Sequence, residues 1–399
     1  MTSISRNLKS LLLEHFEENR QMAFVAGPRQ VGKTTVCQEV GDYYLSWDNT
    51  EHQDLILSGP KAVAEFSGLH KPQSKKPVLV LDELHKFSRW KNFLKGFFDV
   101  YEKQVGIVVT GSSKLDVYRR GGDSLMGRYF LYHLHPISVG ELTQNSSSDA
   151  LIQAPIHLAE EQWDNLQIHG GFPEPFVKAN QRFSRRWQDL RHNQLFKEDT
   201  RELTRIQELQ QLEALGRILA KSSSEQIVYS RLSKQIRVDE KTVRSWMDTL
   251  SDLHYGFLVR PWFRNLNRAL RKEPKWYLRD WSSIQDEGQR YETLIACHLY
   301  KAVEVWTDLG LGNFSLHYIR DKEQREVDFL IVRDEQPWFL VEAKRSDDHL
   351  SPTLSHFQKQ LDCPHAFQVT LNAPYLDADC FDYQNPFVVP AKTLLSQLP

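Results

Sequence analysis

The sequence predicts an α/β fold whose N-terminal part is a parallel sheet with flanking helices. Two short apolar runs support this prediction, residues 22–26 (MAFVA) and 78–81 (VLVL), because each has the length of a strand and is apolar throughout. Strands buried on both faces of a parallel sheet have this composition. The first run is followed by a glycine-rich string and then by TTVCQEV, which has the pattern of a helix. A strand, a loop and a helix in succession are typical of parallel α/β folds.

The glycine-rich string predicts a phosphate-binding loop. Residues 27–35 read GPRQVGKTT, which fits G-x-x-x-x-G-K-[ST] at every fixed position. Glycines let such a loop fold around a phosphate chain with its N–H groups pointing inward, and the helix N-terminus adds positive potential. We expect Lys33 to reach the β- and γ-phosphates and the Thr34 hydroxyl to hold Mg²⁺. The expected cofactors are ATP and Mg²⁺, and the predicted nucleotide-binding residues are Gly27, Pro28, Arg29, Gln30, Val31, Gly32, Lys33, Thr34 and Thr35.

The second apolar run ends in two carboxylates, Asp82 and Glu83, as a Walker B strand does. Ligands of α/β proteins bind at the carboxyl ends of the strands. We expect Asp82 to orient Mg²⁺ through its water shell and Glu83 to position or polarise the attacking water. A third strand, residues 106–110, leads into a small polar segment in which Ser112 is the predicted sensor of the γ-phosphate or the catalytic water, ahead of Thr110 and Ser113.

Three arginines follow, Arg119, Arg120 and Arg128. Phosphoryl transfer concentrates negative charge on the γ-phosphate oxygens, and an arginine supplied in cis or in trans stabilises that charge. Arg128 is the predicted finger, and a solvated or core-bordering arginine is the alternative for each of the three. A finger acting in trans requires at least a dimer.

The strings GPRQVGKTT, VLVLDELHK, VTGSSKLD and LMGRYFLYHLHPISVGEL resemble a prokaryotic branch of the AAA-type P-loop ATPases. The resemblance covers nearly the whole chain and implies a P-loop NTPase core, a homo-oligomer with a ring as one form, and a C-terminal domain of unknown function with a nuclease-like core. GGFPEPF (residues 170–176) is similar to a segment of the family's small helical lid, which implies that Pro173 borders the nucleotide base. The same residues are also compatible with a simple turn.

Residues 209–263 change to closely spaced short helices. Asp239 is a predicted cap, and the next helix buries a stripe at i, i+3, i+4, i+7 and i+10, which consists of Val243, Trp246, Met247, Leu250 and Leu253. With HYGFLVRPWF as a β-wing, this is the layout of a winged helix-turn-helix. Lys241, Thr242 and Arg244 are its predicted DNA contacts, and a spacer or protein-contact module is the alternative.

Residues 260–279 contain seven basic residues and one acidic residue, with Trp262, Phe263, Trp276 and Tyr277 interleaved. Basic side chains neutralise phosphates and aromatic rings can stack on unpaired bases. Arg264, Arg268 and Arg271 are therefore further predicted DNA contacts. The alternative is core aromatics beside a solvated basic face.

The segment REVDFLIVRDEQPWFLVEAK predicts a hairpin of two strands, residues 326–332 and 338–343. If the hairpin is symmetric about Glu335, Asp328 lies opposite Glu342, and Lys344 projects on the same face. Two carboxylates and a lysine can bind Mg²⁺ and activate water against a phosphodiester. The pattern resembles the PD-(D/E)XK nuclease superfamily, although Val327 rather than proline precedes Asp328. That resemblance implies catalytic roles for Glu292, Asp328, Glu342 and Lys344, with Asp328 and Glu342 as metal ligands.

The 399 residues fit two to four domains. We expect an ATPase core at 1–150, a small helical lid at 151–205, a winged helix-turn-helix at 206–263 and a mixed α/β nuclease-like domain at 264–399. The net charge of −2 argues neither for nor against nucleic acid, and four scattered cysteines are typical of reduced thiols. No apolar run approaches the length of a membrane span, so a cytoplasmic protein is expected.

Together these patterns predict an ATP-binding and ATP-hydrolysing protein that acts on DNA, with nucleotide state controlling DNA binding and metal-dependent cleavage. DNA repair, branched-DNA processing and defence are compatible with this prediction. A nucleotide-switched DNA-binding or scaffold protein with an inactive nuclease fold is the main alternative. A third is that the basic segments bind RNA or a partner protein.

Overall fold

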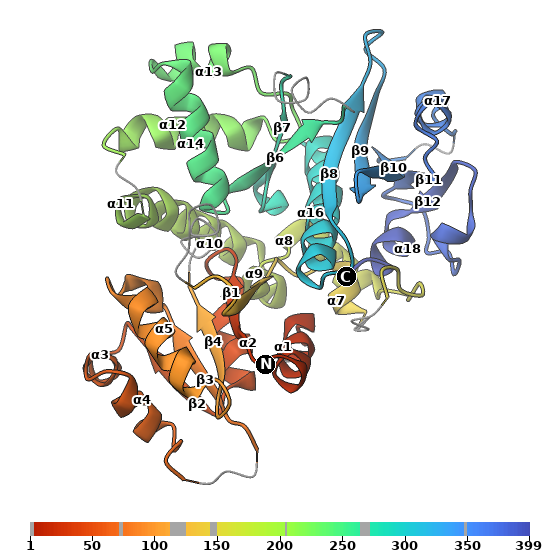
Figure 1. Cartoon of the computed structure of the whole chain (residues 1–399). Helices are drawn as coiled ribbons and strands as arrows, with labels where there is room; N and C mark the ends of the chain where they lie inside the picture. Colours follow the sequence, from red (N-terminus) through yellow and green to blue (C-terminus); the bar gives the residue numbers. More distant parts are fainter. Residues whose placement is uncertain are drawn as a thin grey trace. The chain divides into compact units, whose positions relative to one another are not determined.

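The computed structural model describes residues 4–71, 75–111, 125–143, 150–203, 206–263, 272–346 and 349–399. The chain divides into two compact units, Met1–His135 and Pro136–Pro399. Each unit has its own sheet, and the colours of Figure 1 separate the first unit, red to orange, from the second, yellow to blue. No helix in these ranges has both the length and the apolar character that crossing a membrane would require.

The first unit is a five-stranded sheet with helices, in the strand order β2-β3-β4-β1-β5. All of its strand pairs are parallel. Because β1 and β3 both pair with β4, the loops that follow β1 and β3 lie at the same edge of the sheet. In chain order the elements are α1 (Asn7–Glu18), β1 (Met22–Ala26), α2 (Lys33–Val40), β2 (Tyr43–Ser46), α3 (Thr50–Leu57), α4 (Pro60–Phe66), β3 (Val78–Asp82), a 3-10 turn η1 (Leu84–Lys86), α5 (Trp90–Tyr101), β4 (Gly106–Thr110) and β5 (Tyr129–His133).

The core of this unit explains why the apolar runs become strands. Every residue of β1, β3 and β4 is buried. Phe24, Leu79 and Ile107 from these strands pack in one cluster with Leu94 and Phe97 of α5. An α/β fold with a parallel sheet, as predicted, is therefore confirmed for the first unit.

The second unit begins with a run of helices: α7 (Val139–Leu142), α8 (Glu160–His169), α9 (Pro173–Lys178), α10 (Gln181–Asn193), a π-helical turn η3 (Gln194–Asp199), α11 (Thr200–Leu203), α12 (Leu209–Lys221), α13 (Tyr229–Ile236) and α14 (Glu240–Asp252). The predicted three short helices correspond to α12, α13 and α14. Figure 1 shows them in green beside strands β6 and β7.

A seven-stranded mixed sheet completes the second unit, in the order β12-β11-β10-β9-β8-β6-β7. Helix α16 packs against β8 and helix α17 against β11 (Figure 1). The boundary expected at 263/264 falls inside the antiparallel β6–β7 hairpin, whose strands belong to this one sheet. The elements are β6 (Gly256–Pro261), β7 (Lys275–Leu278), η4 (Trp281–Ser283), α16 (Glu287–Asp308), β8 (Phe314–Arg320), β9 (Glu326–Arg333), β10 (Gln336–Lys344), α17 (Pro352–Leu361), β11 (His365–Thr370), η5 (Cys380–Asp382), β12 (Phe387–Pro390) and α18 (Ala391–Ser396).

Candidate functional site

The glycine-rich string forms a tight loop between β1 and α2. Gly27 has φ of 140° and Gly32 has φ of 98°, both in the region that favours glycine. A Cβ on Gly27 would lie 2.2 Å from the carbonyl oxygen of Leu134. The backbone at Gly27 therefore has no room for a side chain, which explains the glycine there without reference to any ligand.

Lys33, the first residue of α2, folds its side chain back over this loop. Its Nζ donates hydrogen bonds to the carbonyl oxygens of Gly27 and Pro28, both at 2.8 Å. Burial lowers the pKa of Lys33 to about 8, against the opposing effect of Glu83 and Asp82. The ammonium is thus held at the centre of the loop, where the oxygens of a phosphate chain could replace the two carbonyls.

Asp82 accepts several hydrogen bonds at the edge of the sheet where β1, β3 and β4 end. Its Oδ2 accepts hydrogen bonds from the Thr34 hydroxyl at 3.1 Å and from the Tyr44 hydroxyl at 2.6 Å. Its Oδ1 accepts one from the Thr110 hydroxyl. The predicted pair of Thr34 and Asp82 is therefore brought together, in the arrangement that a Mg²⁺ bound by a hydroxyl and a carboxylate needs.

Glu83 follows directly in a left-handed conformation, with φ of 54°. A non-glycine residue in this region carries backbone strain, which often accompanies a functional role. Burial raises the pKa of Glu83, while Lys86 and Lys33 lower it. A carboxylate with a raised pKa and a fifth of its side chain exposed (20%) is suited to orient water and to accept its proton.

Two residues around this site were not predicted. Tyr44 reaches Asp82 from β2, the neighbour of β3, so only the strand order could have indicated it. Arg6 is buried, and its guanidinium donates to the carbonyl oxygen of Val31 at 2.8 Å and to that of His135. It supports the phosphate loop from before β1, and no sequence motif marks it.

Arg128 does not lie in the phosphate site of its own chain. Its carbonyl accepts from Met22 N, and Met22 is opposite Tyr129 in the parallel β1–β5 register. Arg128 is thus at the amino end of the sheet, while the phosphate loop is at the carboxyl end. Its guanidinium pairs with Asp99 of α5 at 2.8 Å. A role in cis is excluded by this position, and a role in trans stays a prediction.

The remaining predicted residues of the nucleotide site are placed as follows. Pro173 begins α9 in the second unit, so its predicted place beside the base stays a prediction. Ser112, Ser113, Arg119 and Arg120 lie outside the described residues.

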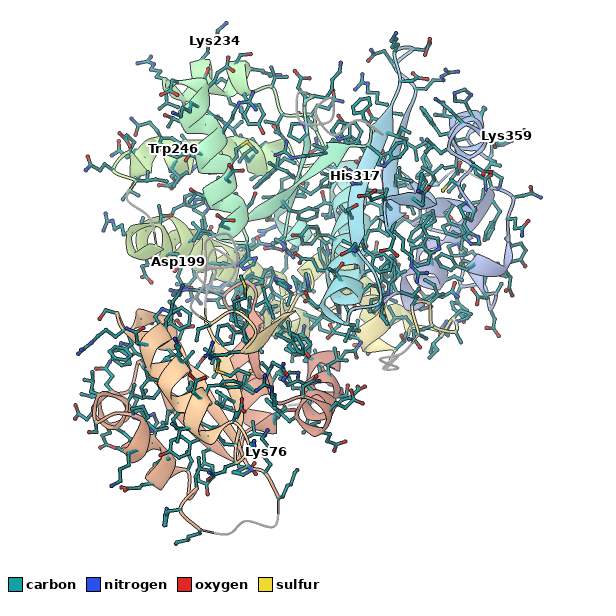
Figure 2. All side chains as sticks on the ribbon, viewed as in Figure 1. Lys76, Asp199, Lys234, Trp246, His317 and Lys359 are labelled. Atoms are coloured by element: carbon teal, nitrogen blue, oxygen red, sulfur yellow. The ribbon has the colours of Figure 1, made fainter. Side chains whose placement is uncertain are left out.

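The three helices α12 to α14 bury the predicted stripe, because Val243, Trp246, Met247, Leu250 and Leu253 are all buried. Figure 2 labels Trp246 on α14 and Lys234 on α13. Asp239 caps α14 by accepting from Thr242 N at 2.8 Å, and the Thr242 hydroxyl donates back at 2.8 Å. Both the backbone N–H and the hydroxyl of Thr242 therefore take part in the N-cap of α14. We define the basic helix face as the exposed Arg231, Lys234, Arg237, Lys241 and Arg244 of α13, α14 and their junction.

The second basic segment, residues 260–279, has a part outside the described residues and a buried part. Arg264, Arg268 and Arg271 lie outside the described residues. Trp276 and Tyr277 are fully buried, and so are nearly all atoms of Lys275 and Arg279. Trp276 and Tyr277 are therefore core aromatics and do not stack on bases, whereas Lys275 and Arg279 are buried and do not form the solvated basic face of the alternative.

Lys275, which the sequence did not single out, joins three carboxylates. Its Nζ lies 2.7 Å from Oε1 of Glu326, 3.2 Å from Oε1 of Glu292 and 3.4 Å from Oδ1 of Asp328. The Tyr277 hydroxyl donates to Glu292 at 2.7 Å. Burial lowers the pKa of Lys275, but the three carboxylates outweigh it and raise the pKa overall. Lys275 is therefore a firmly held cation.

Glu292 has a strongly perturbed acidity within this cluster. Burial raises its pKa to about 7, the charge of Asp328 adds to the rise, and Lys275 opposes it. We call Lys275, Glu292, Glu326 and Asp328 the lysine cluster.

The β9–β10 hairpin has the predicted register from Phe339 on, after a register shift between Pro337 and Phe339. Val341 pairs with Phe329, so the same register continued places Glu342 opposite Asp328. However, β9 has one extra residue against β8, because His317 (Figure 2) pairs with Leu330 and Ile319 pairs with Val327. Such a bulge re-aims side chains. It accompanies the turn of Asp328 toward Lys275.

Glu342 has a different partner. Its Oε1 is 2.9 Å from Nζ of Lys344, and its Oε2 is buried without a hydrogen-bond partner in the described part of the chain. The Asp328 carboxylate also accepts from Ala343 N at 3.0 Å. The predicted four residues therefore form two groups, Glu292 with Asp328 around Lys275, and Glu342 with Lys344.

A divalent metal does not fit the first group, because the ammonium of Lys275 already contacts both Glu292 and Asp328. Within the described ranges, no set of three or more His, Cys, Asp or Glu side chains is arranged to hold a metal ion. The metal role of Asp328 and Glu342 is not favoured by this geometry and stays a prediction.

The parallel sheet, the phosphate loop and the Thr34–Asp82 pair define a P-loop nucleotide-binding fold. Residues 19–143 match a family described as an AAA domain. The match and the geometry support an ATPase of the AAA type. Residues 160–284 and 287–389 match two families described as domains of unknown function, DUF8612 and DUF4143.

Similar proteins extend over most of the chain. Uncharacterized proteins of Mycobacterium tuberculosis and Mycobacterium bovis are each 22% identical over 345 residues, covering 84% of this chain and 72% of theirs. AMPPCP-bound DnaA from Aquifex aeolicus is 13% identical with a TM-score of 0.32, over 63% of this chain and 89% of that one. A katanin structure is 15% identical with a TM-score of 0.25, over 36% of this chain and 55% of that one. At these TM-scores the ATPase assignment depends on the AAA-domain match and the site geometry.

Proposed function

We propose that this protein is an ATP-hydrolysing switch that binds DNA through its second unit, with a nuclease-like domain that does not cut DNA. The observation that carries the nucleotide part is the Asp82 carboxylate, which accepts from Thr34 at 3.1 Å beside a lysine held in the phosphate loop. These groups come from separate segments and meet at the edge of the sheet where α/β proteins bind ligands.

The chemistry follows from the placement of the side chains. Lys33 would leave the two loop carbonyls and bind the β- and γ-phosphates. Thr34 and Asp82 would hold Mg²⁺, which neutralises charge on the phosphate oxygens when it is bound. Glu83 would orient the attacking water and accept its proton. Arg128 would act on the nucleotide of a second copy, so the active form would be a homo-oligomer.

The basic helix face supports DNA as the partner. The three short helices have the order of a helix-turn-helix, whose second helix of the pair presents its N-terminal residues to a groove. The strand expected as the wing, β6, is part of the seven-stranded sheet. Lys241 and Arg244 are exposed in the first turns of α14. The Arg244 guanidinium lies 3.8 Å from the centroid of the Tyr229 ring, which holds it in place.

Nucleotide hydrolysis and DNA binding can be tested together. We expect the ATPase rate to rise when duplex or branched DNA is added and to vanish in Lys33→Ala. The double variant Lys241→Ala/Arg244→Ala should weaken DNA binding. The slope of log K against log salt concentration should become shallower by about two, one for each lost phosphate contact. Lys359→Ala, which removes an exposed lysine of α17 (Figure 2), is the matched control. Stimulation by RNA alone, or by no nucleic acid, would reject DNA as the partner.

The absence of cleavage rests on the lysine cluster, in which an ammonium takes the place that a metal would need. Plasmid, linear and branched DNA incubated with Mg²⁺ or Mn²⁺ should stay intact with the wild-type protein. Cleavage that disappears in Lys344→Ala would refute this part of the proposal and establish the predicted nuclease site.

A further inference from the structure

We infer that Lys275 is the built-in cation of the second unit, and that its ammonium keeps divalent metal ions out of the lysine cluster. The three carboxylates come from two elements, Glu292 from α16 and the other two from β9, while the lysine comes from β7. Residues 272–346 thus bring four charged groups together from segments up to about fifty residues apart, and each carboxylate contacts the same nitrogen atom.

Geometry leaves no room for a divalent ion among these oxygens. A divalent ion must approach carboxylate oxygens to about 2.0–2.6 Å. The oxygens of Glu292, Glu326 and Asp328 already surround Nζ of Lys275 at 2.7 to 3.4 Å. A metal ion between them would occupy the space of the ammonium and be repelled by its charge.

The three carboxylates also have other donors within the protein. Arg320 of β8 donates to Oε2 of Glu326 at 3.2 Å, so this carboxylate binds a second fixed cation. Tyr277 donates to Glu292, and Ala343 N donates to Asp328. All three carboxylates therefore have neutral or cationic donors besides Lys275.

The backbone of Lys275 is fixed from both sides. It pairs with Val259 of β6 and forms an isolated bridge with Gln226. Its neighbour Trp276 donates through N to the carbonyl of Glu225 at 3.1 Å. Only 5% of the Lys275 surface is exposed, so the side chain has little room to leave the carboxylates. The cluster consequently also fastens the β6–β7 hairpin to α16 and β9.

Titration of the nucleotide-free protein with Mn²⁺, followed by electron paramagnetic resonance, tests the inference. The wild type and Glu292→Gln should take up Mn²⁺ alike, because the cluster contributes no site in either. Lys275→Met should gain a site that binds at least roughly tenfold more tightly than any in the wild type, since three carboxylates then lack their cation. That site should disappear when Glu292→Gln is added.

Lys359→Met is the matched control, because it removes an exposed lysine outside the cluster and should leave Mn²⁺ uptake unchanged. Any weak uptake at Asp82 is common to all these proteins and cancels in the comparison. A rise of the melting temperature of Lys275→Met with Mn²⁺, absent in the wild type, would give a second readout.

Two results would overturn the inference. One is a Mn²⁺ site in the wild type that Glu292→Gln removes, which would mean that a metal displaces the ammonium. The other is a folded Lys275→Met protein without a new site, which would mean that the carboxylates need no cation. If Lys275→Met does not fold, the comparison of wild type with Glu292→Gln decides alone.

Discussion

The lysine cluster should make the stability of the second unit depend on pH through Glu292. Its pKa in the folded protein is about 7, against an ordinary value of 4.5, because burial and then the charge of Asp328 disfavour the carboxylate. The folded state holds this proton more tightly than the unfolded state. Stability linked to the proton is therefore fully present below about pH 4.5 and is lost as the pH rises through about 7.

The size of the effect follows from the same shift. At about 1.4 kcal/mol for each pKa unit, the wild type should lose at most about 3 kcal/mol of unfolding free energy between pH 4.5 and pH 8. The value is an upper limit, because 20% of the Glu292 side chain is exposed. Glu292→Gln cannot titrate and should lack this loss. The ion pair with Lys275 forms only where Glu292 is ionised, so its contribution is already contained in the pKa of about 7.

Native-state hydrogen exchange of peptides from α16 and β9 measures the stability of the second unit alone. A local measurement is needed because a global unfolding experiment also reports on the first unit. Other titrating groups are common to both proteins and cancel. Glu287→Gln is the control, since this glutamate of the same helix has 56% of its side chain exposed and should follow the wild type. If Glu292→Gln and the wild type lose the same protection between pH 5 and pH 8, the pKa of Glu292 is not raised and the reasoning fails.

Three further predictions concern the first unit. Gly27→Ala places a Cβ 2.2 Å from the Leu134 carbonyl oxygen at a φ of 140°, so the phosphate loop must change its shape. Calorimetry on the folded variant should then detect no ATP binding, and retained affinity would contradict the steric account. Tyr44→Phe removes a 2.6 Å bond to Asp82 and should lower the unfolding free energy of this unit by about 1.5–3 kcal/mol in urea, whereas an unchanged midpoint would show that the bond contributes nothing. Arg128→Ala should leave ATP affinity intact but reduce ATP turnover by roughly 10³-fold, because the finger acts on the transition state. An unchanged turnover would mean that Arg128 is no finger and that its role is the ion pair with Asp99.

The nucleotide site was predictable because its parts are local. The phosphate loop follows a strand directly, and Asp82 ends another, so short strings determine both positions. Tyr44 could not be predicted, because its contact with Asp82 depends on β2 lying beside β3. The strand order is a property of the whole sheet, and nothing near Tyr44 in the sequence indicates it.

In the second unit the local predictions held and the long-range one did not. The buried stripe of α14 and the pairing of β10 with β9 from Phe339 on both follow from neighbouring residues. The surroundings of Asp328 depend instead on β8, which creates the bulge, and on β7, which delivers Lys275. In the sequence Lys275 is one of seven basic residues in a stretch that suggested a solvated, DNA-binding surface. Its burial results from the pairing of β7 with β6, which the sequence does not reveal.

Two buried lysines, Lys33 and Lys275, show why only one of these sites is suited to a ligand. Burial lowers the pKa of Lys33 to about 8, because its direct partners are two neutral carbonyls and the nearby Glu83 and Asp82 compensate only in part. The pKa of Lys275 is raised, because three carboxylates contact it directly. An incompletely compensated ammonium gains most from a polyanion such as a triphosphate. A fully compensated one gains nothing from an added anion and repels an added cation. The phosphate loop is therefore suited to a polyanion, whereas the lysine cluster connects elements of the fold.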